Sequence, residues 1–151
     1  MLMKTLSTLC RSVLTVVVCS LFAYAASAQQ IDPKALYEIV SSNGLVLDNQ
    51  ESQENSTNIF LAARVAGKAS QAWNIVPAGD GYYTITNATV DKSIDNNNTR
   101  EANTAVIQWD RTDSHANQMW KITPAGDNVY TLTCMSNGLN LGYPDSGLPG
   151  E

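Results

Sequence analysis

The chain has 151 residues, a length that fits one domain better than two. Hydrophobic residues make up 44% of it and charged residues 15%, which is apolar enough for a core and too weakly charged for a disordered chain. The formal net charge of −5 disfavours proteins that bind nucleic acid or an anionic membrane through a basic surface.

The first 28 residues have the features of a secretory signal peptide. Lys4 and Arg11 accompany an apolar run over residues 12–24, and an Ala-Ser-Ala cleavage site ends at Ala28. The run is shorter than the roughly 20 residues that span a bilayer, which disfavours a membrane anchor. We therefore expect cleavage before Gln29, export to a secreted, periplasmic or cell-surface location, and no membrane insertion after cleavage.

Cleavage would leave residues 29–151 as the mature domain. This domain has 7 basic and 14 acidic residues, because Lys4 and Arg11 are removed. Cys134 is its single cysteine, so no disulfide can form within it and the fold must depend on its core.

The mature sequence repeats itself at an offset of 47 residues. Residues 71–80 (QAWNIVPAGD) reappear as residues 118–127 (QMWKITPAGD). The repeats are expected at about 35–81, 82–128 and 129–151. The third would be truncated, because its tryptophan would fall sixteen residues past Glu151.

Short strands are predicted in each repeat, because apolar residues alternate with polar ones and turn signals such as Asn43-Gly44 separate the runs. After the signal segment no window has a sustained helical pattern. About four strands per 47 residues indicate an all-β repeat architecture. The alternating pairs are Tyr37/Ile39, Leu45/Leu47, Trp73/Ile75, Tyr83/Ile85, Trp120/Ile122 and Tyr130/Leu132.

Two Gln-x-Trp motifs, at 71–73 and 118–120, follow Leu-Asp-Asn at 47–49 and Ile-Asp-Asn at 94–96. With these motifs the sequence resembles the ricin-type β-trefoil lectins from Ala35 to Tyr143. The resemblance implies a pseudo-threefold barrel with a cap of hairpins and up to one shallow sugar site per repeat. It also implies that the motif tryptophans lie in the core, where buried indoles contribute strongly.

The resemblance places the sugar-binding residues of the second repeat at Asp95, Trp109, Asn117 and Gln118. An aromatic face would lie under the sugar, and the polar groups would bind its hydroxyls. The first repeat keeps Asp48 but has Ala62 and Ser70 at the aromatic and Asn positions, although Phe60 is nearby. The third has Gly142 in place of Asp, so one competent site is expected, in the second repeat.

Two of these residues also have plainer interpretations. Asp95 precedes three asparagines and could be a turn former whose carboxylate caps backbone N–H groups. Trp109 could be a half-buried packing residue of a strand.

The mature sequence has no recognisable catalytic or metal-binding pattern. His115 is the one histidine, so neither a zinc set nor a Cys–His pair can form, and the segment after Asp95 lacks the Gly and Glu of a calcium loop. There is no Gly-x-Ser-x-Gly elbow, and Asp110 and Asp113 lie in a polar loop without the features of a glycosidase pair. We expect no cofactor, no metal and no catalysis by this chain.

Three functions remain open. The first is an exported carbohydrate-binding module that binds a glycan or polysaccharide weakly and gains affinity through multivalency. The second is the N-terminal binding module of a truncated secreted glycoside hydrolase or other polysaccharide-active enzyme, whose catalytic domain would follow Glu151. The third is a scaffold trefoil without sugar binding.

Overall fold

A computed structural model describes residues 7–8 and 30–143 of the chain. Apart from the first pair, the predicted signal segment at 1–28 lies outside the described residues, and so does the part of the predicted third repeat after Tyr143. Within the described ranges the secondary structure is strands and two 3-10 turns, with no α-helix, as the alternating pattern predicts. The same ranges hold no helix long and apolar enough to cross a membrane.

The strands can be assigned to the three sequence repeats. The first repeat contains β2 (Leu36–Glu38), β3 (Val46–Asp48), β4 (Thr57–Asn58), β5 (Phe60–Ala62), η1 (Ala69–Gln71) and β6 (Trp73–Gly79). The second contains β7 (Tyr82–Asn87), β8 (Lys92–Asp95), β9 (Ile107–Asp110), η2 (Ala116–Gln118) and β10 (Trp120–Gly126). The third opens with β11 (Val129–Cys134), and β1 (Ser7–Thr8) pairs with β2.

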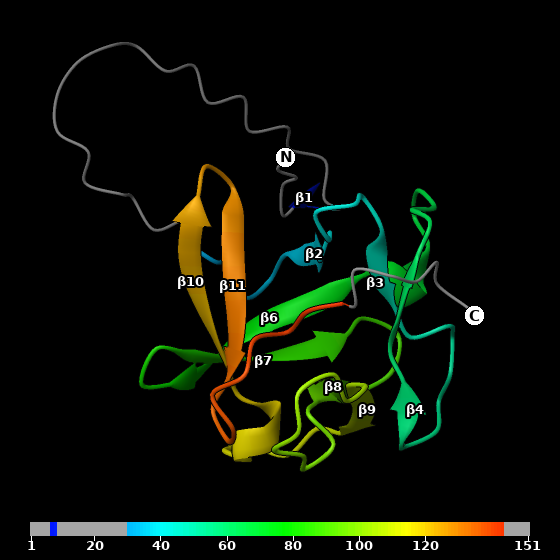
Figure 1. Cartoon of the computed structure of the whole chain (residues 1–151). Helices are drawn as coiled ribbons and strands as arrows, with labels where there is room; N and C mark the ends of the chain where they lie inside the picture. The colour runs from blue at the N-terminus through cyan, green and yellow to red at the C-terminus, as the bar shows by residue number, and fades with distance from the viewer. Residues whose placement is uncertain (1–6, 9–29, 144–151) are drawn as a thin grey trace, which may run out of the picture.

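Two long antiparallel hairpins, β6–β7 and β10–β11, connect successive repeats (Figure 1). Their registers match at the 47-residue offset, with Ile75 opposite Ile85 in the first and Ile122 opposite Leu132 in the second. Each hairpin also shifts register between the proline and the glycine that precede its turn. The sequence repeat is therefore a repeat of backbone geometry.

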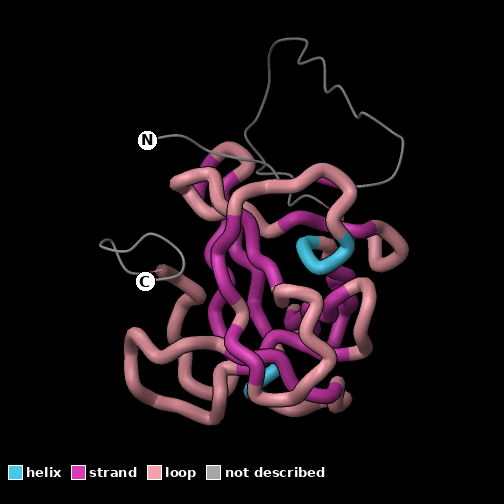
Figure 2. The backbone as a smooth tube through the Cα atoms, turned by 90° about the vertical axis from the view of Figure 1, so that its right-hand side faces the viewer, coloured by secondary structure: helices cyan, strands magenta, loops and turns pink. Residues whose placement is uncertain are grey.

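Equivalent strands also pair within each repeat. Tyr37 of β2 lies opposite Trp73 of β6, and Tyr83 of β7 lies opposite Trp120 of β10. The remaining strands form smaller pairs: β3 pairs with β5, β8 pairs with β9, and β4 pairs with the other edge of β9. In the side view the long strands run close together and the connecting loops project from their ends (Figure 2).

The core lies where the two repeats meet. Trp73 is completely buried and Trp120 is 2% exposed, which confirms the prediction that both motif tryptophans are core residues. A single cluster contains these rings, apolar side chains of the first two repeats and Cys134 of the third: Ala35, Tyr37, Leu47, Ile59, Ile75, Ile85, Ile94 and Cys134.

Candidate functional site

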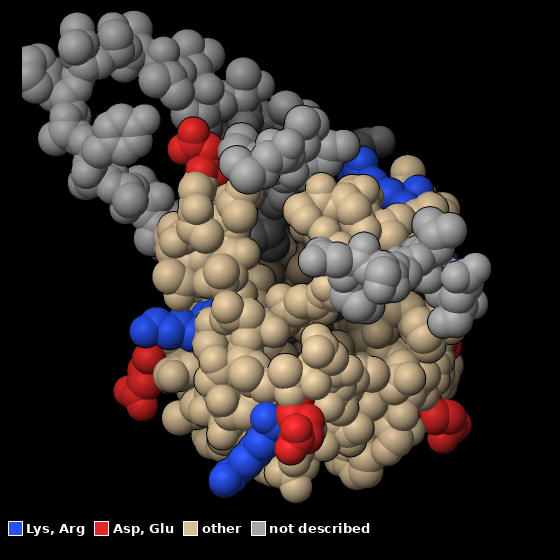
Figure 3. Space-filling model, in the orientation of Figure 1, with Lys and Arg blue, Asp and Glu red and all other residues tan. Residues whose placement is uncertain are grey.

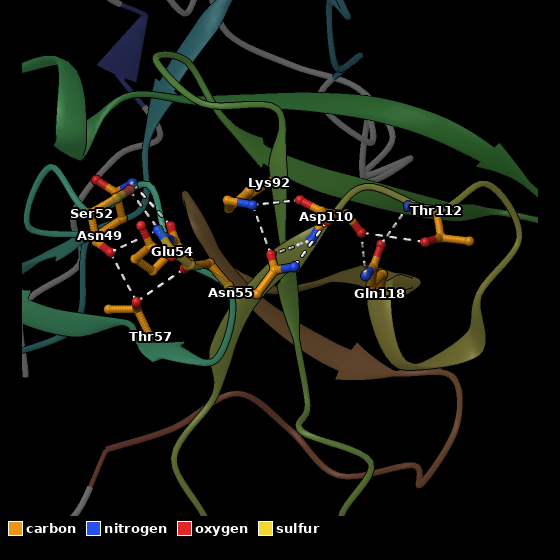
Figure 4. Close-up of polar contacts among 10 residues, drawn as sticks. Asn49, Ser52, Glu54, Asn55, Thr57, Lys92, Asp110, Thr112 and Gln118 are labelled. Atoms are coloured by element: carbon orange, nitrogen blue, oxygen red, sulfur yellow. Dashed lines mark hydrogen bonds and ion pairs between the residues drawn. The ribbon is translucent and has the colours of Figure 1, made fainter.

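Gln118 links three parts of the second repeat. Its Nε2 donates to Asp95 Oδ2 (3.1 Å) on β8 and to the Asp110 carbonyl (3.1 Å) at the end of β9. Its Oε1 accepts from the Thr112 N–H (3.0 Å), as Figure 4 shows. An amide has two donors and one carbonyl, so each polar group of this buried side chain already has a protein partner. Gln118 therefore acts by holding its neighbours in place.

Gln71 makes the same three bonds in the first repeat. Its Nε2 donates to Asp48 Oδ2 (3.0 Å) and to the Ala63 carbonyl (2.9 Å), and its Oε1 accepts from the Val65 N–H (2.8 Å). This match explains why the glutamine of Gln-x-Trp recurs: it satisfies backbone groups where the strand ends and the loop begins.

The tryptophan of each Gln-x-Trp motif adds a further hydrogen bond to the strand that carries the aspartate. Trp73 Nε1 donates to the Leu47 carbonyl (3.1 Å), and Trp120 Nε1 donates to the Ile94 carbonyl (3.0 Å). Because a buried indole N–H needs an acceptor, these bonds fix each ring against the strand that carries the aspartate.

Asp95 lies at the inner end of the candidate site. It is 6% exposed, and its Oδ1 accepts from the Asn97 N–H (2.9 Å) while its Oδ2 accepts from Gln118. The turn-forming interpretation of Asp95 is therefore confirmed. A carboxylate has about four acceptor positions, so these two bonds leave capacity for a ligand hydroxyl.

Trp109 presents an exposed indole next to this carboxylate strand. It lies on β9 opposite the buried Ser93 of β8 and is 42% exposed. An exposed large aromatic ring on a strand offers an apolar surface to a ligand. A residue that only packs against its neighbours does not need such an exposed surface.

Asn117 lies in η2 beside Gln118 and is 8% exposed. Its carbonyl accepts from the Asn96 N–H (3.1 Å), but its side-chain amide makes no hydrogen bond to another described residue. The amide is therefore available for a ligand, whereas both N–H donors of Gln118 are already bonded within the protein.

In the first repeat the equivalent carboxylate, Asp48, forms an ion pair with a lysine. Lys68 Nζ lies 3.0 Å from Asp48 Oδ2, and the Gln50 N–H donates to Asp48 Oδ1 (2.6 Å). Burial by itself would raise the pKa of Asp48, but the Lys68 ammonium and the hydrogen bonds outweigh it and hold the pKa below its ordinary value. Sequence analysis did not identify Lys68, although the repeat offset pairs it with His115.

The other first-repeat positions that align with the candidate site also differ from those of the second repeat. Ala62 and Ser70 stand where the second repeat has Trp109 and Asn117, and Phe60 lies half-buried on β5. Within the described residues there is no group of three or more His, Cys, Asp or Glu side chains that could hold a metal ion.

Comparisons with known proteins place this geometry in a family. The family described as ricin-type beta-trefoil lectin domain-like matches residues 27–109 and, in a second overlapping match, residues 69–150. A search of curated protein sequences gives no match.

Solved structures give the same fold. The designed threefold-symmetric protein ThreeFoil is 28% identical over 70% of this chain and 76% of its own, with a TM-score of 0.65. An exo-β-1,3-galactanase from Clostridium thermocellum is 30% identical over 72% of this chain, with a TM-score of 0.65, but this chain spans 24% of the galactanase. The cytolethal distending toxin of Haemophilus ducreyi, at 12% identity and a TM-score of 0.60, shares the fold. The predicted all-β trefoil fold is thus confirmed.

Proposed function

The chain belongs to the ricin-type beta-trefoil lectin domain-like family, and from this premise we propose that it is a carbohydrate-binding module with one competent sugar site, in the second repeat. The observations that carry the proposal are the exposed Trp109 ring on β9, the strand paired with the one that carries Asp95, and the uncommitted amide of Asn117 beside Gln118. Repeat one has an alanine and a lysine-capped carboxylate at the matching places.

Each residue has a distinct part in this proposal. Trp109 stacks against the apolar C–H face of a sugar ring, while Asp95 accepts hydrogen bonds from its hydroxyls and Asn117 can donate or accept. Gln118, the fourth residue of the expected site, positions Asp95, because both of its N–H donors are already bonded within the protein. A single shallow site of this kind binds weakly, so useful affinity would come from several copies or from attachment to a larger protein.

One face of the molecule carries few charged side chains. On the face seen in Figure 3, acidic and basic side chains are scattered over a largely uncharged surface. We propose neutral glycans or polysaccharides as ligands, reached by export of the chain through the signal segment at 1–28.

A second candidate is a module that works within a larger polysaccharide-acting protein. It is favoured by the 30% identity to the exo-β-1,3-galactanase, in which the similar region is a minor part of the chain. In that case the module would direct a separate catalytic domain to its polymer, and the residues of the proposed sugar site would be unchanged.

Trp109→Ala tests the site. On an array of neutral glycans that includes β-1,3-linked galactan, we expect the wild type to bind and Trp109→Ala to lose binding, with Kd raised at least about tenfold in titration. Trp109→Tyr keeps an aromatic face and should retain part of the affinity. Val65→Ala is the matched control, since Val65 is also an exposed apolar residue, at 52%, but lies in the first repeat.

Two results would contradict the proposal. Unchanged binding by a folded Trp109→Ala variant would show that the site is elsewhere. A wild type that binds no glycan on the array would favour the scaffold function.

A further inference from the structure

The strand that carries Trp109 is shared between two repeats. One edge of β9 pairs with β8, and the other pairs with β4 of the first repeat, where Thr57 lies opposite Gln108. The Ser56 N–H also donates to the Gln108 carbonyl (3.0 Å). The indole of the candidate site therefore lies where the first repeat meets the second.

The residue before Trp109 is anchored in the first repeat. Gln108 is completely buried, and its Nε2 donates to the carbonyls of Ser52 (3.0 Å) and Glu54 (2.8 Å). Its Oε1 accepts from Asn49 Nδ2 (3.0 Å). This side chain holds the first repeat's loop against β9.

The residue after Trp109 is held by an amide of the same loop. Asn55 Nδ2 donates to Asp110 Oδ2 (2.9 Å), and Asn55 Oδ1 accepts from the Asp110 N–H (3.0 Å). Asn55 thus binds both the backbone and the side chain of Asp110, which fixes its position more tightly than one bond would (Figure 4).

Lys92 of β8 completes this clamp, which consists of Asn55, Lys92 and Asp110. Its Nζ donates to Asn55 Oδ1 (2.7 Å) and forms an ion pair with Asp110 Oδ1. The Lys92 ammonium and then the Asn55 amide hold the pKa of Asp110 below its ordinary value. The carboxylate therefore stays ionised and bonded through the neutral and mildly acidic range.

The clamp connects to the sugar-binding carboxylate. The Asp110 carbonyl accepts from Gln118 Nε2, and the same nitrogen donates to Asp95 Oδ2. A displacement of Asp110 would therefore disturb both the neighbouring Trp109 and the support of Asp95.

Unlike the Gln-x-Trp bonds, the clamp has no counterpart at the 47-residue offset. Alanine stands at 102 and at 63, and leucine at 45, where the repeat places the equivalents of Asn55, Asp110 and Lys92. The trefoil framework does not require these polar contacts elsewhere, and they occur beside the one strand that carries an exposed indole.

We propose that Asn55 is a positioning residue of the carbohydrate site, so that the first repeat orients the Trp109 platform of the second. This inference rests on the proposed function for its binding consequence, but the orientation of Trp109 can be measured without a sugar.

The test compares Asn55→Ala with the wild type by NMR of the three ¹⁵N-labelled indole groups. We expect the Trp109 resonance to shift and its order parameter to fall, while Trp73 and Trp120 keep theirs. In titration with a β-1,3-linked galactooligosaccharide, Kd should rise about tenfold. The matched control is Asn58→Ala, which removes an exposed asparagine from the same segment and should change neither readout.

A rescue distinguishes positioning from a general loss of folding. Asn55→Asp alone places two carboxylates together and should mimic Asn55→Ala. The Asn55→Asp/Asp110→Asn double variant exchanges donor and acceptor, keeps one carboxylate for Lys92, and should restore the Trp109 signal and the affinity.

Two results would overturn the inference: an unchanged Trp109 indole in a folded Asn55→Ala variant, or a double variant no better than Asn55→Asp. If the wild type binds no glycan, the proposed function fails, while the indole measurement still decides whether Asn55 positions Trp109.

Discussion

Asp48 and Asp95 occupy equivalent positions but have different electrostatic surroundings. Both accept a hydrogen bond from the motif glutamine and from a backbone N–H two residues ahead. Asp48 also faces the Lys68 ammonium, whose equivalent in the second repeat is His115. A cation from the protein thus takes the place in repeat one that a ligand hydroxyl would take in repeat two.

Lys68→Met should make stability depend differently on pH. Because the folded-state pKa of Asp48 is lowered, its ionised form stabilises the fold above its ordinary pKa of 3.8, and this contribution is lost as pH falls through the lowered value. Without Lys68 we expect the free energy of unfolding to fall by about 1–3 kcal/mol at pH 7, and this difference from the wild type to become smaller towards pH 2. Urea unfolding from pH 2 to 7 measures this.

Lys121→Met, which changes an exposed lysine of β10, is the control and should have little effect at any pH. If Lys68→Met lowers the free energy of unfolding by the same amount at every pH, then the aliphatic stem of Lys68, rather than its charge, stabilises the fold.

Sequence analysis could assign core residues where a motif recurs. Trp73 and Trp120 could be assigned to the core because the same motif appears twice in register with the strands around it. Lys68 could be recognised only by its contact with Asp48, since a lysine aligned with a histidine carries no signal. Asn55 could not be found at all, because it acts on Asp110, a residue 55 positions away with no repeat equivalent.

At the level of elements, the first two repeats share the same set of Gln-x-Trp contacts, which we call the joint. A 3-10 turn brings the motif glutamine to the aspartate strand, and the next strand begins with a tryptophan bonded to that strand's backbone. The alternating pattern predicts about four strands per repeat, whereas the first repeat has five and the second has four. The pattern does not predict the pairing of β9 with β4, which joins the two repeats.

Trp73→Phe and Trp120→Phe should destabilise the protein by similar amounts. Each removes a buried indole hydrogen bond to a carbonyl and leaves space in the core, so we expect losses of about 2–3 kcal/mol in urea unfolding. Trp109→Phe, at the exposed position, should stay within about 0.5 kcal/mol of the wild type. Markedly unequal costs for the two core variants would show that the joints are not energetically equivalent.

At the level of the whole molecule, the three tryptophans fall into two classes of accessibility. Trp73 and Trp120 are buried and Trp109 is 42% exposed. Neutral acrylamide should therefore quench about one third of the fluorescence readily. A bound glycan should remove most of that fraction, because it would cover the Trp109 face.

This measurement compares accessible fractions with and without ligand, using Trp109→Tyr as the control that lacks the accessible indole. Three equally quenched tryptophans would contradict the buried core, and a ligand that leaves quenching unchanged would place the sugar away from Trp109.

The bonds of the repeated joint and those of the clamp also differ in how much chain they enclose. The Gln and Trp motif bonds join residues 23 and 26 positions apart, whereas the Asn55 and Gln108 side-chain bonds to the other repeat join residues 37 to 59 apart. Closing a loop twice as long costs about 0.6 kcal/mol more entropy, so each repeat can close on its own joint before the repeats dock. We therefore expect the contacts around Trp109 to form after the two tryptophan joints and to open before them, so that the proposed binding face is lost while both joints are still intact.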